Sequence, residues 1–317
     1  HAGEGRGVML NLLRAELLRL ISNRKVAVLG AFVLGLGFWI SASMAVTLRP
    51  YTALDWEEAR RQSNDAQINL EVICGSSSSS SDCTALPTNI TVEGFLRPQM
   101  SFEQFVVSSL ELTMQMGLLI VVVLITVMIG TEFSTGAIGT QLTFTPRRLP
   151  LLWAKALASA ICGVCLMAIW ATAMVLLGVF FYLNVRGIEG LTAGSLLGAQ
   201  VGRALLAGAV MGMLAALVTM ALASTAKTWA LISAVLVLSQ FLEFSKDVAQ
   251  TAWLLPTTNA FSLINGDWSR TIYNGEGVRQ ESIPHLDYGY SLGYAAFWLV
   301  VFGIWASASF SRRNILK

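Results

Sequence analysis

Histidine is almost missing from this chain, and no lysine follows a glycine. The two histidines among 317 residues, His1 and His285, are too few and too far apart to supply the paired ligands of a zinc hydrolase. Without a Gly-Lys step there is no Walker A loop to hold nucleotide phosphates. We therefore expect no catalytic site, no metal and no cofactor in this chain. If ATP and Mg²⁺ drive it, another chain binds them.

Charge is scarce as well. Charged residues make up 13% of the sequence and hydrophobic residues 55%, a balance that cannot cover a water-soluble surface. The overall charge of +2 gives no indication of a nucleic-acid partner. The chain is therefore predicted to be an integral membrane protein, embedded in the lipid bilayer and without nucleic acid.

Apolar runs long enough to cross a hydrocarbon core of roughly 30 Å as helices recur along the chain. They predict an all-α fold with six transmembrane helices. The third run is long enough to tilt or to extend into water, and the fifth is short, which favours an adjoining interfacial or re-entrant segment. The runs are 26–48, 105–130, 149–183, 205–226, 228–242 and 288–310.

The distribution of charge predicts the orientation. With both termini in the cytoplasm, the inner side holds 12 of the 21 basic residues and three of the 19 acidic ones, a net charge of +9. The outer side then holds nine basic and 16 acidic residues, a net charge of −7, in agreement with the positive-inside rule. The N-terminal segment 1–25 contains leucines at helical spacing with arginines around them, which predicts an amphipathic helix on the inner membrane surface. A simple topogenic anchor is the alternative.

Residues 49–104 form the largest predicted soluble segment, on the outer side. A stretch rich in Glu and Arg, 55–73, predicts a helix there, and a serine run between Cys74 and Cys83 follows it. These two cysteines are expected to form a disulfide, because disulfides persist outside the cytoplasm. The alternative is two free thiols in a flexible serine-rich tract.

Six polar side chains lie within or at the ends of the apolar runs, where contact with lipid is costly. The predicted topology places all of them toward the outer leaflet, where they are candidates for the wall of a translocation path. The alternative is that each one caps a helix end at headgroup level. They are Glu111, Gln115, Gln200, Arg203, Gln240 and Glu243.

Small residues in the third and fourth runs predict close helix packing. Gly208 and Gly212, four residues apart, give the fourth run a face of small residues. Cys162 and Cys165 lie in the third run with no histidine or second cysteine pair nearby, so they are interpreted as packing residues rather than metal ligands.

The segment 131–148, between the second and third runs, has a composition that contact with lipid would not require. It mixes Gly, Thr and Gln with the aromatic Phe144 and ends in Pro146, Arg147 and Arg148. We expect a short polar turn that contacts another protein, with Phe144 as its aromatic anchor. The alternative is that Arg147 and Arg148 bind anionic lipid headgroups.

The order of residues around this turn resembles that of permease subunits of type-2 ABC transporters. Residues 16–25 are similar to the interfacial helix of that family, and residues 254–266, within the predicted extracellular segment 243–287, to its segment before the last span. The resemblance covers most of the chain except residues 49–103. The matching residues are Glu132, Gly136, Leu142, Pro146, Arg148 and Lys155, and the departures from the family pattern are Ala137 and Gly139.

The resemblance implies a permease of an ATP-driven exporter in the plasma membrane. The permease would form a homodimer, or a heterodimer with a similar subunit, bound to two cytoplasmic ABC ATPase subunits that hold ATP and Mg²⁺. The turn would dock on the ATPase and couple its closure to a path between the two permeases. The residues expected to couple are Glu132, Thr140, Gln141, Phe144, Pro146, Arg147 and Arg148.

Two other classes of function stay open at this point. A secondary transporter would show internal repeats and ionisable residues at the bilayer midplane, and the sequence shows neither. A membrane-anchored sensor or structural protein built around the external loop would not need the polar turn at 131–148.

The disulfide is the first testable prediction. A peptide that contains Cys74 and Cys83, isolated without reductant, should gain about two mass units on reduction, because each sulfur takes up a hydrogen. Cys83→Ser should abolish this gain and Cys162→Ser should not. Loss of the bridge should cost the external loop about 2 to 3 kcal/mol. Complete alkylation of both thiols in freshly isolated membranes would contradict the prediction.

Overall fold

The computed structural model describes residues 24–76, 90–96, 99–144, 148–188, 190–192, 194–244, 253–268, 271–273, 279–282 and 286–312. The predicted interfacial helix lies outside this part of the chain except for its last two residues. Within the described part, six helices are long and apolar enough to cross a membrane, which confirms the six predicted runs. The chain is thus a predominantly helical, multi-pass membrane protein.

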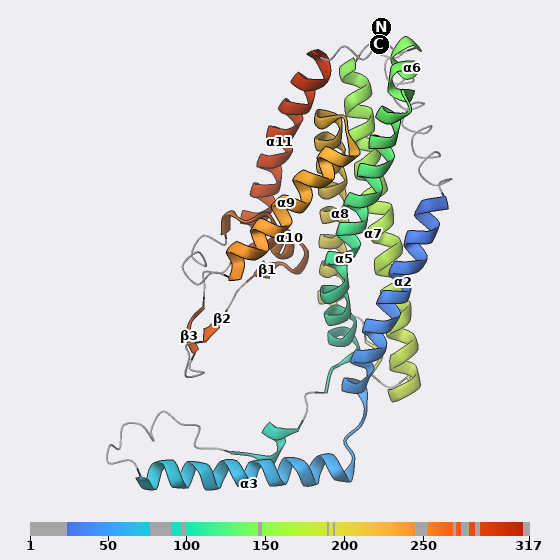
Figure 1. Ribbon diagram of the computed structural model, residues 1–317. Helices are drawn as coiled ribbons and strands as arrows, with labels where there is room; N and C mark the ends of the chain where they lie inside the picture. The colour runs from blue at the N-terminus through green and yellow to red at the C-terminus, as the bar shows by residue number, and fades with distance from the viewer. Residues whose placement is uncertain are drawn as a thin grey trace.

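The six helices form an elongated bundle (Figure 1). They are α2 (Arg24–Met44), α5 (Phe102–Ser134), α7 (Arg148–Arg186), α8 (Ser195–Leu222), α9 (Thr225–Phe244) and α11 (Tyr288–Arg312), and the 3₁₀ helix η1 (Ala45–Leu48) continues α2. A short helix, α6 (Ala137–Phe144), and the C-terminal end of α11 lie at one end of the bundle. A separate helix, α3 (Ala53–Ser76), lies crosswise at the opposite end.

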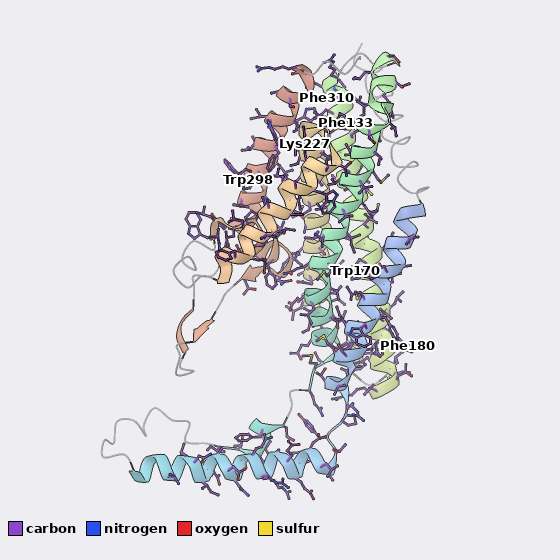
Figure 2. All side chains as sticks on the ribbon, viewed as in Figure 1. Phe133, Trp170, Phe180, Lys227, Trp298 and Phe310 are labelled. Carbon is purple, nitrogen blue, oxygen red and sulfur yellow. The ribbon has the colours of Figure 1, made fainter. Side chains whose placement is uncertain are left out.

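Helices α5 and α8 form the centre of the bundle. In each of them 61% of the most apolar stretch is buried, against 11% in α9 and 18% in α2, so the latter two lie at the periphery. A polar contact joins the interior to α7: the indole Nε1 of Trp170 donates to Oγ1 of Thr113 on α5, at 3.3 Å. Figure 2 shows Trp170 near mid-bundle and Phe180, also on α7, toward the α3 end.

Small residues bring α7 and α8 into close contact. A Cβ on Gly208 would lie 2.6 Å from the backbone oxygen of Gly163, and a Cβ on Gly212 would lie 2.5 Å from that of Ser159. Neither position has room for a side chain. The predicted role of Gly208 and Gly212 in close helix packing is therefore confirmed.

Two charged side chains fix the end of the bundle that lies nearer α3. Arg186, the last residue of α7, donates from Nε to the backbone oxygen of Leu48 at 2.8 Å and from Nη2 to Oε1 of Gln99 at 2.6 Å. Glu103, in the first turn of α5, accepts from the backbone N–H of Leu197 at 3.0 Å. This carboxylate caps the N-terminus of α8, which begins ahead of the predicted run 205–226.

The predicted external helix is present as α3, three residues longer at its C-terminal end and two at its N-terminal end than the stretch 55–73. It begins with a capping pair, since Thr52 donates its backbone N–H to Oδ2 of Asp55 at 2.7 Å and accepts from the Asp55 N–H at 3.3 Å. Ala59 and Ser63 are buried where α3 packs against the 3₁₀ helix η2 (Val92–Phe95).

The predicted extracellular segment after α9 contains a packed helix and short strands. Helix α10 contacts α5, α8, α9 and α11, as a re-entrant piece after the fifth span would. Two short antiparallel ribbons follow it within an otherwise helical structure, and the β2 residues are β-branched or aromatic, which favours extended pairing. The elements are α10 (Pro256–Asn265), β1 (Asp267–Trp268) paired with β4 (Leu286–Asp287), and β2 (Thr271–Tyr273) paired with β3 (Arg279–Ser282).

Substitution of Gly208 by leucine is expected to force α7 and α8 apart, because even a Cβ would meet the backbone of Gly163. The expected loss is roughly 3 kcal/mol, at the upper end of the range for overpacked cores. It can be measured as a fall in the melting temperature of the purified chain in detergent. Gly202→Leu is the matched control, because it lies in the same helix and a Cβ there meets nothing within 4 Å. Equal losses at both positions would exclude the helix contact as the cause.

Candidate functional site

Helix α6 occupies most of the segment that the sequence predicts as a polar turn. Helix α5 runs on to Ser134, and Gly136, with a φ of +72°, turns the chain in a conformation that a Cβ would strain. Ile138 and Leu142, one helical turn apart, are buried where α6 packs against the bundle. The segment is therefore a helix with two apolar anchors rather than an irregular turn.

The other side of α6 is polar. Thr140 and Thr143 are exposed, and Gln141 is half-buried. Oγ1 of Thr143 donates to the backbone oxygen of Thr140 at 2.6 Å, so its hydroxyl is held along the helix. The remaining coupling candidates of this stretch lie outside the described part of the structure: the side chain of Phe144, and Pro146 and Arg147 entirely.

Arg148, another predicted coupling residue, begins α7 and contacts a neighbouring helix. Its Nη1 donates to the backbone oxygen of Ser311 at 3.0 Å, near the C-terminal end of α11. A guanidinium in this position compensates the negative end of the helix dipole. Arg148 therefore joins α7 to α11. A substitution at Arg148 would weaken the contact between these two helices as well as any binding of another protein to this segment.

Glu132 and Lys155 form a buried ion pair beneath α6. Nζ of Lys155 lies 2.7 Å from Oε2 of Glu132, and the two residues are 2% and 5% exposed, respectively. Glu132 belongs to the last turns of α5 and Lys155 to the first turns of α7. The Glu132 carboxylate, expected among the docking contacts, thus faces α7 and joins two spans next to α6.

Gln200 and Arg203 of α8 meet the C-terminal end of α10. Nη1 of Arg203 donates to the backbone oxygen of Asn265 at 2.7 Å, and Nε2 of Gln200 donates to Oδ1 of Asn265 at 3.2 Å. Gly266, with a φ of +97°, makes room for Arg203, whose Cζ would be 2.6 Å from a Cβ there. The same guanidinium lies 5.8 Å from the ring centroid of Tyr288. Both predicted path residues hold α10 in place.

Glu111 of α5 belongs to the same region. Its half-buried carboxylate is close enough to Arg203 and Asp267 for both charges to act on it. The structure thus brings Glu111, Gln200 and Arg203 together from two helices at the C-terminal end of α10. Their common function in the fold is to surround that helix end with polar groups.

Gln115 and Gln240 line a partly open cavity of about 800 Å³ between α5, α8, α9, α10 and α11. Its volume is in the range of small-molecule binding sites. Most of the lining side chains are aliphatic or aromatic, and none of the described lining residues is charged. The last path candidate, Glu243, has its side chain outside the described part of the structure.

Helix α10 forms a wall of this cavity that sequence analysis misses. Nδ2 of Asn259 donates to the backbone oxygens of Trp253 and Leu255, at 2.7 and 2.9 Å, and its Oδ1 accepts from Oγ of Ser291 on α11 at 3.2 Å. A proline in the first turn, Pro256, is a local signal for a helix start. No local signal shows that this helix packs inside the bundle.

The described residues contain neither a metal-binding cluster nor a disulfide. They contain no group of three or more His, Cys, Asp or Glu placed to hold a metal ion, and Cys162 and Cys165 are free thiols on α7. Cys74 lies near the end of α3, and Cys83 lies outside the described part. The described residues contain no disulfide, and the Cys74–Cys83 bridge stays a prediction.

Comparison of the chain with protein-family models, with curated proteins and with solved structures found no match. The function is therefore inferred from two features of the structure, α6 with its supports and the cavity beside α10.

Replacement of Lys155 by methionine should leave the Glu132 carboxylate buried without its partner, at a cost of about 3 to 5 kcal/mol. The double variant with Glu132→Gln should recover most of this loss, because neither remaining group is charged. Thermal melting of the purified chain measures both effects. Lys227→Met, which removes an exposed lysine, should change stability by less than about 0.5 kcal/mol. A double variant as unstable as the single one would contradict the pairing.

Proposed function

We propose that this chain is the permease subunit of an ATP-driven exporter of the type-2 ABC class, acting in the plasma membrane as a dimer with two cytoplasmic ATPase subunits. The proposal rests chiefly on α6, a short helix between two long spans. It presents exposed threonines and is anchored by Ile138 and Leu142. These 317 residues contain no Walker A loop, so the proposal assigns ATP hydrolysis to a partner subunit.

The charge of the α6 end supports a cytoplasmic location. Arg148 and Lys155 at the start of α7, Lys227 at the start of α9 and Arg312 at the end of α11 belong to this end, with Glu132 as a partly compensating acid. Figure 2 shows Lys227 there, near Phe133 and Phe310. An excess of basic residues next to helix ends is typical of the cytoplasmic side.

The contacts around α6 can transmit a displacement to the rest of the bundle. Its apolar anchors rest on the bundle, the Glu132–Lys155 pair joins α5 to α7, and Arg148 joins α7 to α11. A push on α6 would therefore move α5, α7 and α11 together. Helices α5 and α11 both line the cavity, so movement at the docking surface would change its shape.

The cavity supports a transport function. In the proposed dimer, the outward side of α9, where Val237, Leu238 and Phe241 are exposed, would face the second permease across the path. Export is the direction that the family resemblance implies. A secondary transporter is less well supported, because no described charged side chain lines the cavity to couple an ion.

The test is purification of the tagged chain from cells that naturally make it, followed by assays for Mg²⁺-dependent ATP hydrolysis. We expect a Walker A-containing ATPase to co-purify and to account for all the activity. Thr140→Trp with Thr143→Trp should reduce its retention roughly 5- to 100-fold, corresponding to about 1 to 3 kcal/mol of interface energy.

Thr172→Trp is the matched control, because Thr172 is an exposed threonine in the membrane-spanning part of α7. It should retain the ATPase fully. Hydrolysis by the chain free of any second subunit would refute the proposal, and so would a wild-type chain that binds no ATPase. Full retention by the α6 variant would place the interface elsewhere.

A further inference from the structure

The lining of the cavity restricts what it can hold. All its described walls are uncharged, and the polar atoms come mainly from two glutamines and from the first turns of α10. Transfer of an ion from water into an uncharged cavity costs free energy when no counter-charge is present, whereas burial of apolar surface there is favourable. The nearest charged group identified on the same face of α5, Glu111, lies one helical turn away from Gln115 and does not line the cavity.

One buried polar atom in the wall lacks a hydrogen-bond partner. Oγ1 of Thr257, in the first turn of α10, forms no hydrogen bond. The side chain of Trp298, on α11, is hydrogen-bonded to Tyr294. Tyr294, which also lines the cavity, already donates its hydroxyl to the backbone oxygen of Leu254 at 3.0 Å. Buried polar groups in proteins normally have partners, so a hydroxyl group from outside the chain, which can donate to or accept from Oγ1 of Thr257, would complete this wall.

We infer that the cavity binds an uncharged, mainly apolar small molecule that carries a hydroxyl group. The apolar part lies among the aliphatic and aromatic side chains of α5, α8, α9 and α11, and the hydroxyl hydrogen-bonds to Thr257. The site lies within one chain and needs no residue of a second copy. Its identification as a cargo site rests on the proposed function, but binding itself does not.

Photolabelling tests this inference with the full-length chain alone, reconstituted in phosphatidylcholine nanodiscs. The probe is dodecanol with a diazirine halfway along its chain, and the matched probes are the corresponding carboxylic acid and trimethylammonium compounds. We expect the alcohol to label residues of α9, α10 and α11 that line the cavity and to be displaced by unlabelled dodecanol. Labelling by each charged probe should be at least about tenfold weaker, because its head group would lose hydration.

Paired variants separate the cavity from the lipid-facing surface. Ala260→Trp places an indole in the cavity and should abolish the labelling, whereas Leu176→Trp, on an exposed position of α7, should not change it. Thr257→Val removes the hydroxyl at nearly constant shape and should weaken labelling about fivefold, which is the loss of affinity expected for one hydrogen bond. Thr172→Val, at an exposed position, should have no effect. Unchanged melting temperatures show that the variants are folded.

Three results would overturn the inference. Equal labelling by a charged probe would show that the ligand need not be neutral. Labelling that neither excess dodecanol nor Ala260→Trp reduces would show ordinary partitioning into lipid. Adducts that link two copies would show that the second permease occupies the cavity. Specific binding without ATP-driven export in the assembled complex would instead refute the proposed function and leave the site standing.

Discussion

The close contact between α7 and α8 is the constraint on which the arrangement of the other helices depends. Lipid tails are as apolar as leucine side chains, so helices in a bilayer associate through tight packing and polar pairs. Gly163, Gly208 and Gly212 allow two backbones to touch, and α8 also contacts α5, α10 and α11. With α8 fixed against α7 on one side, α9, α10 and α11 line the cavity on the other.

Three of the charged side chains near the spans hold helix ends. Glu103 caps the start of α8, Arg203 the end of α10 and Arg148 the end of α11. A helix end has unpaired backbone groups and a partial charge, and in a bilayer there is little water to satisfy them. Arg203, a predicted path residue, is thus needed first for the fold.

The two parts of the candidate site therefore differ in charge and polarity. The α6 end combines basic residues with a supported, exposed helix, which suits contact with a protein in water. The cavity is apolar and lies among the spans, which suits a ligand taken from a membrane-like environment. Helices α5 and α11 belong to both parts: the Glu132–Lys155 pair joins α5 to α7, and Arg148 joins α7 to α11.

The sequence by itself determined the six spans, helix α3 and the glycine face of α8, because a bilayer requires long apolar runs and because helical spacing is a local property. It also located the segment that forms α6, although not its helical form, which depends on Gly136 and on burial of Ile138 and Leu142. Only the tertiary structure decided that Glu132 meets Lys155, that Arg203 caps α10, and that Gln115 and Gln240 share a cavity. Each of these pairings joins residues far apart in the chain, and which residues meet depends on how the helices pack rather than on any local pattern.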